Sequence, residues 1–243
     1  MARLLSRLRR RVGTLQRGGV QRFERALGID TTGIIEEEEI YVTEPEREGY
    51  QGSGWIDLRR MLRPGEVKPE DVFLDLGSGK GKVVMLAARY PFARVIGVEI
   101  ADELNEIARR NLAAARGRRR CKDVELVTAD VLEYEIPPDA SVVYLYNPFR
   151  GSLFDAVVAK LIDSVDRHPR TVRVIYLNPK EHDRLMATGR FRLERVAGRL
   201  RPRRSEAARS YIRLYVLEPQ AGTFHPSGSR TPSTPPGPGG STS

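Results

Sequence analysis

The chain has few of the cysteine and histidine residues that disulfides, catalytic thiols and metal sites require. Its 243 residues include one cysteine and three histidines, so an internal disulfide is excluded and no Cys/His cluster has the spacing of a metal site. The lone Cys121 follows a run of arginines and has no recognisable activating partner, which argues against a catalytic thiol. A chain without disulfides is typical of a reducing compartment, so we expect a cytoplasmic protein.

Long apolar runs are also absent. The mean hydropathy is −0.42, and no apolar stretch approaches the ~20 residues that span a bilayer, so no transmembrane segment is expected. Arginines interrupt every apolar run at the N-terminus, which argues against a secretory signal peptide. The charge is strongly positive instead, with a net charge of +9 and a pI of about 9.9. This surplus suits an anionic partner, such as RNA or acidic lipid, and equally suits plain solubility.

Four segments of different composition follow one another. Residues 1–28 are rich in arginine and carry leucines at helical spacing, which predicts a basic amphipathic helix. Such a helix either contacts a membrane surface, RNA or another anionic polymer, or packs on the domain that follows it. Residues 29–71 predict a cap or linker segment, and residues 72–219 predict the main domain. Residues 220–243, rich in Pro, Gly and Ser, predict a disordered tail.

The main domain alternates between apolar strands and amphipathic helices. Near-continuous apolar strands interleaved with helices predict a parallel sheet that is covered on both faces. The last two strands have no helix between them and are expected to form an antiparallel hairpin at one edge. The predicted fold class is α/β, a Rossmann-like doubly wound, mostly parallel seven-stranded sheet with a C-terminal antiparallel hairpin. Strands are expected at 72–76, 94–100, 124–130, 141–149, 171–179, 191–198 and 211–219, and helices at 82–90, 101–116, 154–167 and 181–189.

Three glycines follow the first of these strands in the stretch DLGSGKGK, residues 75–82. Open parallel sheets bind ligands beyond the carboxyl ends of their strands, and glycines let the backbone adopt positive φ and approach a ligand closely. The spacing does not match a P-loop, and it is one residue shorter than the dinucleotide fingerprint G-x-G-x-x-G. Asp75, just before the glycines, would repel a pyrophosphate and attract a cation. The loop therefore favours a phosphate-free, positively charged nucleoside such as S-adenosylmethionine.

Two further acids stand at the ends of the next two strands. Glu99 follows Gly81 by 18 residues (99 − 81), close to the ~20 expected for an acid that binds ribose hydroxyls. Asp130 is placed to reach an adenine amino group, and the N–H of Val131 can bond a ring nitrogen. An acid at a strand end is often only a helix cap. Three acids at successive strand ends are harder to explain in that way.

These stretches resemble the motifs of class I S-adenosylmethionine-dependent methyltransferases in their order and spacing. The matching stretches are VFLDLGSGKGKVV, VIGVEI, ELVTAD and VVYLYNPF, within a region from about Tyr50 to Leu217. The DLGSGxG form is similar to that of several protein-lysine methyltransferases, including the non-SET histone type, and of many bacterial members. The resemblance implies a cofactor site lined by Tyr50, Asp75, Gly77, Ser78, Gly79, Gly81, Glu99, Ile100, Asp130, Val131 and Asn147.

The fourth strand is followed by Asn147-Pro148-Phe149, where amino-methyltransferases of this family carry [N/D/S]-P-P-[Y/F/W]. The resemblance implies that the Asn147 side chain and a backbone carbonyl near Pro148 accept hydrogen bonds from the target amine. It also implies that the Phe149 ring stabilises developing positive charge. The chain has one proline where the pattern has two, which leaves amine specificity open. The alternative is that this stretch is only a strand-end turn.

Three hypotheses about function remain. The leading one is an S-adenosylmethionine-dependent methyltransferase whose acceptor is a nitrogen of a protein lysine or a small molecule, or else RNA. A nicotinamide-dependent oxidoreductase would share the sheet and Glu99, but Tyr176 and Lys180, which match its Y-x-x-x-K pair, are separated by Pro179 and do not share a helix. The third is a non-catalytic basic protein that binds RNA or anionic lipid through residues 1–28.

Overall fold

The computed structural model describes residues 19, 21–32, 34, 35, 50–115, 117, 119–197 and 212–220. Most of the predicted N-terminal helix lies outside the described residues, as do the arginine-rich stretch 198–211 and all but the first residue of the predicted tail. Residues 21–27 are helical. The proposed segment boundaries therefore stay predictions.

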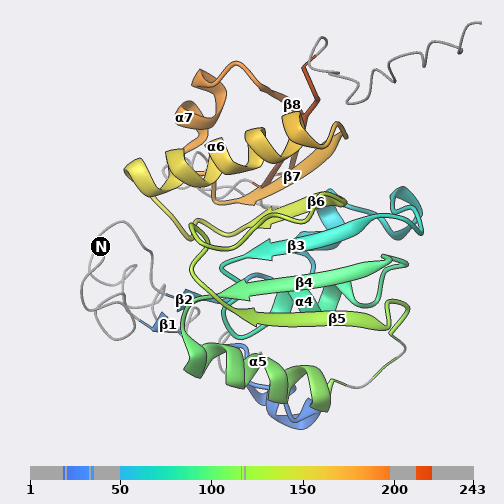
Figure 1. The fold of residues 1–243 in the computed structure, drawn as a ribbon. Coiled ribbons are helices and arrows are strands. Elements are labelled where there is room, and N and C mark those ends of the chain that lie inside the picture. The colour runs from blue at the N-terminus through green and yellow to red at the C-terminus, as the bar shows by residue number, and fades with distance from the viewer. Residues whose placement is uncertain are drawn as a thin grey trace, which may run out of the picture.

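Seven strands form one sheet in the order β5-β4-β3-β6-β7-β9-β8 (Figure 1). Only β9 runs antiparallel to its neighbours within this sheet, and the remaining pairs are parallel. The mostly parallel seven-stranded fold with a C-terminal antiparallel hairpin is thus confirmed, and β9 lies inside the sheet while β8 forms its edge. The strands are β3 (Val72–Leu76), β4 (Arg94–Glu99), β5 (Asp123–Thr128), β6 (Ala140–Leu145), β7 (Val172–Leu177), β8 (Phe191–Ala197) and β9 (Ile212–Leu217).

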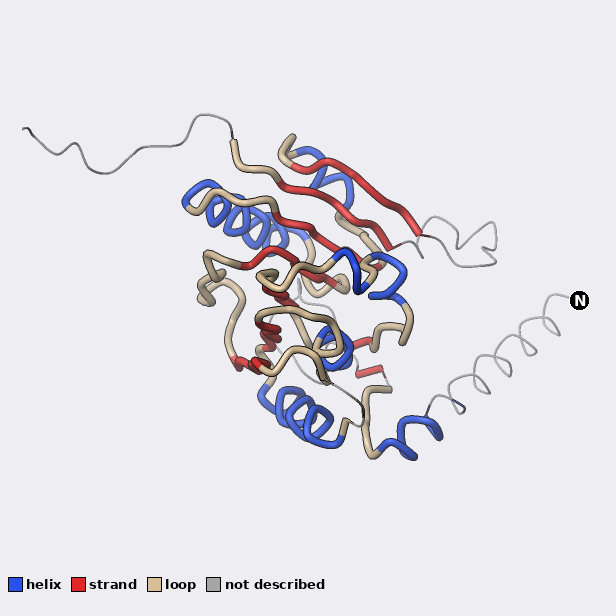
Figure 2. The backbone as a smooth tube through the Cα atoms, turned by 90° about the vertical axis from the view of Figure 1, so that its right-hand side faces the viewer, coloured by secondary structure: helices blue, strands red, loops and turns tan. Residues whose placement is uncertain are grey.

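Helices lie on both sides of the strand layer, as Figure 2 shows. They are α3 (Asp57–Met61), α4 (Lys82–Ala87), α5 (Asp102–Ala114), α6 (Gly151–Arg167) and α7 (His182–Ala187), with a 3-10 turn at Pro64–Glu66. Two short strands, β1 (Ile34–Ile35) and β2 (Tyr50–Gln51), pair with each other at the end toward which the β3 and β4 arrows point (Figure 1). None of the described helices combines the length and the apolar character needed to cross a membrane.

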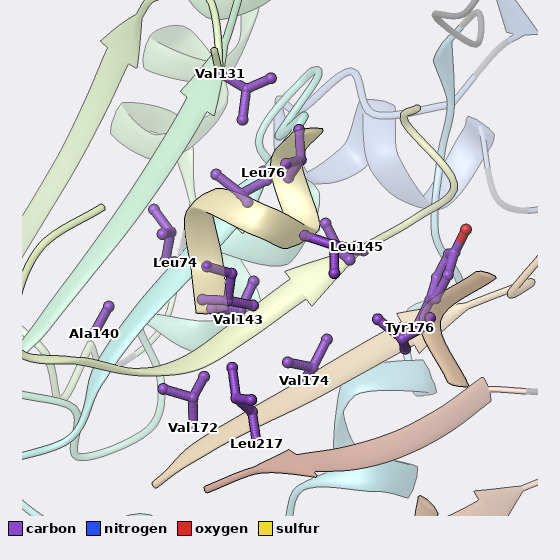
Figure 3. Close-up of a cluster of buried hydrophobic side chains, with 14 of the residues drawn as sticks. Leu74, Leu76, Val131, Ala140, Val143, Leu145, Val172, Val174, Tyr176 and Leu217 are labelled. Atoms are coloured by element: carbon purple, nitrogen blue, oxygen red, sulfur yellow. The ribbon is translucent and has the colours of Figure 1, made fainter. Parts of the chain in front are cut away.

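Alternate residues along the central strands belong to two separate hydrophobic clusters, one on each face of the sheet. Leu74 and Leu76 of β3 face a cluster that includes α6 and α7, whereas Phe73 faces a cluster that includes α3 and α4. Figure 3 shows part of the first cluster, where Leu74, Val143 and Val174 come from three neighbouring strands. Each such side chain contributes ~1.5–3 kcal/mol when fully buried. Burial on both faces explains why the strands read as continuous apolar runs.

The N-terminal residues that the structure describes are joined to the main domain through buried polar contacts. Glu24 is 1% exposed, and its carboxylate accepts hydrogen bonds from the backbone N–H and the hydroxyl of Thr31. The same carboxylate forms an ion pair with Lys82 of α4 at 3.1 Å. For residues 21–32, the structure therefore supports packing on the domain, which was one of the two alternatives for the basic N-terminal segment.

Candidate active site

Two loops meet where the strand order of the sheet reverses. β3 and β6 are neighbours, and the strands that follow each of them in sequence are added on opposite sides of this pair. A Cβ built on Gly77, after β3, would lie 2.6 Å from the Cβ of Pro148, after β6. The glycine loop and the Asn147-Pro148 turn are therefore in direct contact, at the position where open α/β sheets bind their ligands.

The glycine loop has the backbone that its sequence predicts. Its shape is fixed on two sides: the N–H groups of Gly77 and Ser78 both donate to the carbonyl of Val98, and a Cβ on Gly81 would lie 2.8 Å from the Cβ of Ala108 in α5. The Ser78 hydroxyl is buried and has no hydrogen-bond partner in the part of the chain that the structure describes. All three glycines lie in the left-handed region, with φ of +80° at Gly77, +52° at Gly79 and +74° at Gly81.

Asp75, in β3, presents a buried acid at this loop. The residue is 3% exposed, and none of the described residues donates a hydrogen bond to its carboxylate. Burial raises the pKa of Asp75 well above its ordinary value, and the charge of Glu99 raises it further. A cation placed against this carboxyl would favour its charged form. The arrangement fits the ammonium group of S-adenosylmethionine.

Glu99, at the end of β4, holds the loop from the other side. One carboxylate oxygen accepts the N–H of Gly79 at 2.8 Å, and the other accepts the N–H of Ala101 at 3.0 Å. Each carboxylate oxygen has a further lone pair, so the predicted contact with ribose hydroxyls is compatible with these bonds. That contact stays a prediction, and the structure adds a second role, which is to fix the glycine loop.

The residues expected at the adenine edge follow β5 and β4. The Asp130 carboxylate accepts the N–H of Leu132 at 2.8 Å, and its backbone carbonyl accepts two further N–H groups. Asp130 therefore shapes a turn, as strand-end acids often do. Val131 is 5% exposed and belongs to the cluster drawn in Figure 3, and Ile100 is half-buried. Contacts of these residues with adenine stay predictions.

Asn147 is held in place by a tyrosine from the neighbouring strand. Its φ is +51°, a conformation that asparagine tolerates better than most residues. The side-chain oxygen accepts a hydrogen bond from the Tyr176 hydroxyl at 3.1 Å, and both residues are buried. That oxygen retains a second lone pair for an N–H group of an acceptor.

The segment before β3 also reaches the site. The Ser53 side-chain oxygen and the Tyr144 hydroxyl of β6 are 3.2 Å apart, and both residues are buried. Burial raises the pKa of Tyr144, and the charge of Asp75 contributes to the increase. This places Ser53 over the end of the sheet that holds Asp75. The backbone of Tyr50 lies in β2, and its predicted contact with the cofactor is untested.

A family model described as "Histone methylation protein DOT1" matches residues 56–174. A probable ribosomal RNA small subunit methyltransferase A of Methanopyrus kandleri is 35% identical over 39% of this chain and 32% of its own length. A histone-lysine N-methyltransferase, H3 lysine-79 specific, of Dictyostelium discoideum is 34% identical over 40% of this chain and 5% of its own length. An rRNA N(6)-adenosine-methyltransferase of Caenorhabditis elegans is 38% identical over 32% of this chain and 37% of its own length.

The matched segment, residues 56–174, is just under half of the chain and is similar to the S-adenosylmethionine-dependent methyltransferases of this family. The chain spans about a third or less of the first two relatives. Among solved structures, an RNA methyltransferase from Salinibacter ruber in complex with S-adenosyl-L-homocysteine has a TM-score of 0.43 and 27% identity, with 68% of this chain and 92% of that chain covered. The matched family model agrees with the predicted family and with S-adenosylmethionine as its cofactor.

Two residues of the chain occupy positions that the sequence did not predict. Phe149 is 4% exposed and packs in the hydrophobic cluster that includes α6, so its ring serves the core, and its contact with an acceptor stays a prediction. Tyr176 matched a dehydrogenase pair by chance, because it lies in β7 whereas Lys180 lies in the loop that follows. Its contact with Asn147 could be anticipated only by knowing that β6 and β7 are neighbours in register.

Metal and thiol chemistry find no support within the described part of the chain. No group of three or more His, Cys, Asp or Glu side chains there is arranged to hold a metal ion. Cys121 is buried, and burial raises the pKa of its thiol. A buried thiol with a raised pKa is a poor nucleophile.

Proposed function

We propose that this methyltransferase transfers a methyl group from S-adenosylmethionine to a nitrogen atom of its acceptor. The observation that carries the proposal is the meeting of Asp75, Gly77 and Asn147 at the reversal point of the sheet: a buried carboxylate, bare backbone and a fixed amide oxygen. Two relatives support nitrogen as the acceptor atom, because their names specify methylation of histone lysine and of adenosine N6.

The residues of the chain bind and align the two reactants. Bound S-adenosylmethionine supplies the methyl group, which the acceptor nitrogen takes as the carbon–sulfur bond breaks and S-adenosylhomocysteine is left. Asp75 would pair with the ammonium end, Glu99 would bind the ribose, and Asp130 with the Val131 N–H would bind the adenine edge. Asn147, fixed by the Tyr176 hydroxyl, would accept an N–H of the acceptor and aim its lone pair at the methyl carbon. Such alignment can lower a barrier by ~7–11 kcal/mol.

Calorimetric titration with S-adenosylhomocysteine tests the cofactor assignment. We expect the wild-type chain to bind it, and Glu99→Gln to weaken binding by at least about ten-fold, since the variant loses charge at the ribose contact and at Gly79. Glu103→Gln, an exposed change in the first turn of α5, is the matched control. A wild-type chain that gives no binding heat would contradict the proposal, and equal affinities of the two variants would remove Glu99 from the site.

The acceptor atom is tested by incubating a cell extract with the enzyme and a cofactor labelled in its methyl group. The label is sorted into protein, RNA and small-molecule fractions, and the labelled fraction is digested to find the methylated atom. We expect the label on nitrogen. Label on oxygen or carbon alone would contradict the proposal.

We also keep two proposals that rest on composition: a cytoplasmic location, and contact of the basic N-terminal segment with an anionic partner. Removal of residues 1–18 is the suitable truncation, because a longer one removes the buried Glu24. Pelleting with vesicles of acidic phospholipid should fall on truncation if the segment binds membranes. Equal pelleting of both chains would remove the lipid contact.

A further inference from the structure

Arg213 lies beside the proposed acceptor site. It is the second residue of β9, and because β9 is antiparallel, its start lies at the carboxyl end of β7. Arg213 is the direct cross-strand partner of Tyr176, so both side chains point to the same face of the sheet. The Tyr176 hydroxyl contacts Asn147. Arg213 therefore neighbours Tyr176, the residue that holds Asn147 in place.

The guanidinium of Arg213 has donors without acceptors. Its Nε and Nη1 atoms are buried, and neither has a hydrogen-bond partner among the described residues. A buried donor left unpaired costs ~1–3 kcal/mol, and more when it is charged. Native structures rarely leave such groups without a partner. A ligand that brings an acceptor atom from outside the chain would remove this cost.

Among the described residues, the side chain of Arg213 hydrogen-bonds with the Tyr215 hydroxyl, but no carboxylate forms an ion pair with it. His182 Nδ1 and the Tyr215 hydroxyl are 2.8 Å apart. Burial lowers the pKa of His182, and the charge of Arg213 lowers it further. The charge of Asp183 acts on the pKa values of His182 and Tyr215. Asp183 is exposed and forms no ion pair with Arg213 in the part of the chain that is described. Glu181 is engaged by Arg184 and by a backbone N–H.

We propose that Arg213 is an anion-binding residue of the acceptor site and that it binds a phosphate oxygen in the backbone of an RNA acceptor. This inference rests on the proposed function and names the substrate class for the same site. A guanidinium presents N–H donors in a planar fork that matches phosphate oxygens.

RNA fits this site better than a lysine side chain does. No carboxylate among the described residues pairs with Arg213, so its charge would repel an incoming ammonium group. Every nucleotide, in contrast, carries a phosphate close to its base. The net charge of +9 favours the same partner.

The test measures RNA binding and cofactor binding separately, on the full chain. Anisotropy of a labelled, mixed-sequence single-stranded RNA is followed at several salt concentrations for the wild type, Arg213→Gln and Arg213→Lys. Arg192→Gln is the matched control: Arg192 lies on β8 opposite Val216, at the far end of β9 from Arg213, and its side chain is 63% exposed. S-adenosylhomocysteine titration of every variant reports whether the fold and the cofactor site are intact.

We expect Arg213→Gln to weaken RNA binding about ten-fold and to reduce the slope of log affinity against log salt by ~0.7, the value for one phosphate contact on a single strand. Arg213→Lys should lose less, because it keeps the charge but not the fork. It also serves as the comparison if the glutamine variant does not fold. Arg192→Gln should change little, and cofactor affinity should be the same in all folded variants.

Different results overturn different statements. Equal RNA affinities and salt slopes for Arg213→Gln and Arg192→Gln would overturn the anion site. Methyl label that enters only protein or small molecules, at a rate that Arg213→Gln does not change, would overturn RNA as the acceptor. Failure of the wild type to bind S-adenosylhomocysteine would instead overturn the proposed function.

Discussion

At Gly77 the glycine loop touches the Asn147-Pro148 turn so closely that a side chain has no room, and Gly77→Ala tests this contact. An alanine there must adopt φ near +80°, which costs an L-residue ~1–2 kcal/mol. Its Cβ must also fit 2.6 Å from the Cβ of Pro148, and overpacking of this kind costs ~1–3 kcal/mol. The two effects together predict a loss of ~2–5 kcal/mol in the free energy of unfolding.

Three other glycines separate the two costs. Gly189 has φ of +68° and no described neighbour within 4 Å of an added Cβ, so Gly189→Ala measures the backbone cost alone. Gly97 lacks a positive φ, but an added Cβ would lie 2.7 Å from Val84, so Gly97→Ala measures crowding alone. Gly65 has neither constraint, and Gly65→Ala should be neutral or slightly stabilising.

Urea unfolding of the four variants gives the free energies, and S-adenosylhomocysteine titration gives the consequence for the site. The loss for Gly77→Ala should be close to the sum of the losses for Gly189→Ala and Gly97→Ala, because Gly77→Ala combines the backbone cost of the first with the crowding cost of the second. Only Gly77→Ala should also displace Pro148. A loss for Gly77→Ala no larger than that for Gly189→Ala would refute the contact between the two loops.

Three further predictions concern buried charged and polar groups, two of them in the site. The pKa of Asp75 is raised by burial and by the charge beside it, so its contribution to stability is present below the unfolded pKa and is lost as pH rises through the folded pKa. Asp75→Asn should therefore be more stable than the wild type to urea at neutral pH, and should bind S-adenosylhomocysteine more weakly. Glu24→Gln leaves the buried Lys82 unpaired and should cost ~3–5 kcal/mol, whereas adding Lys82→Met should recover part of that loss in a double-mutant cycle. Tyr176→Phe removes the hydroxyl that fixes the acceptor asparagine, so the methyl-transfer rate should fall while calorimetry shows unchanged cofactor affinity. An unchanged rate would remove Tyr176 from the site.

The sheet and the glycine loop were predictable because they depend on local patterns. Apolar runs of strand length, broken by amphipathic helices, specify a sheet buried on both faces, and the two clusters around Phe73 and Leu74 confirm it. The positive φ angles of Gly77 and Gly81 follow from the residue type at a strand-to-helix turn.

Contacts between distant segments were not predictable in this way. The hydroxyl of Tyr176 meets Asn147 only because β7 pairs with β6 in one register. Nothing local separates a Phe149 ring that faces a substrate from one that joins the core. The ion pair of Glu24 with Lys82 joins residues far apart in the chain, where sequence periodicity carries no information about pairing.

The insertion of β9 between β7 and β8 has a consequence for how the protein is made. The ribosome releases β8 before β9, yet β8 joins the sheet only through β9, which pairs with β7 on one edge and with β8 on the other. Until the last strand emerges, β7 exposes a row of unpaired peptide groups, and β8 has no neighbour to receive it. A nascent chain halted shortly before Ile212 lacks only β9 in its sequence, but its sheet lacks both β9 and β8. This partly made chain would therefore be the species most in need of chaperone protection.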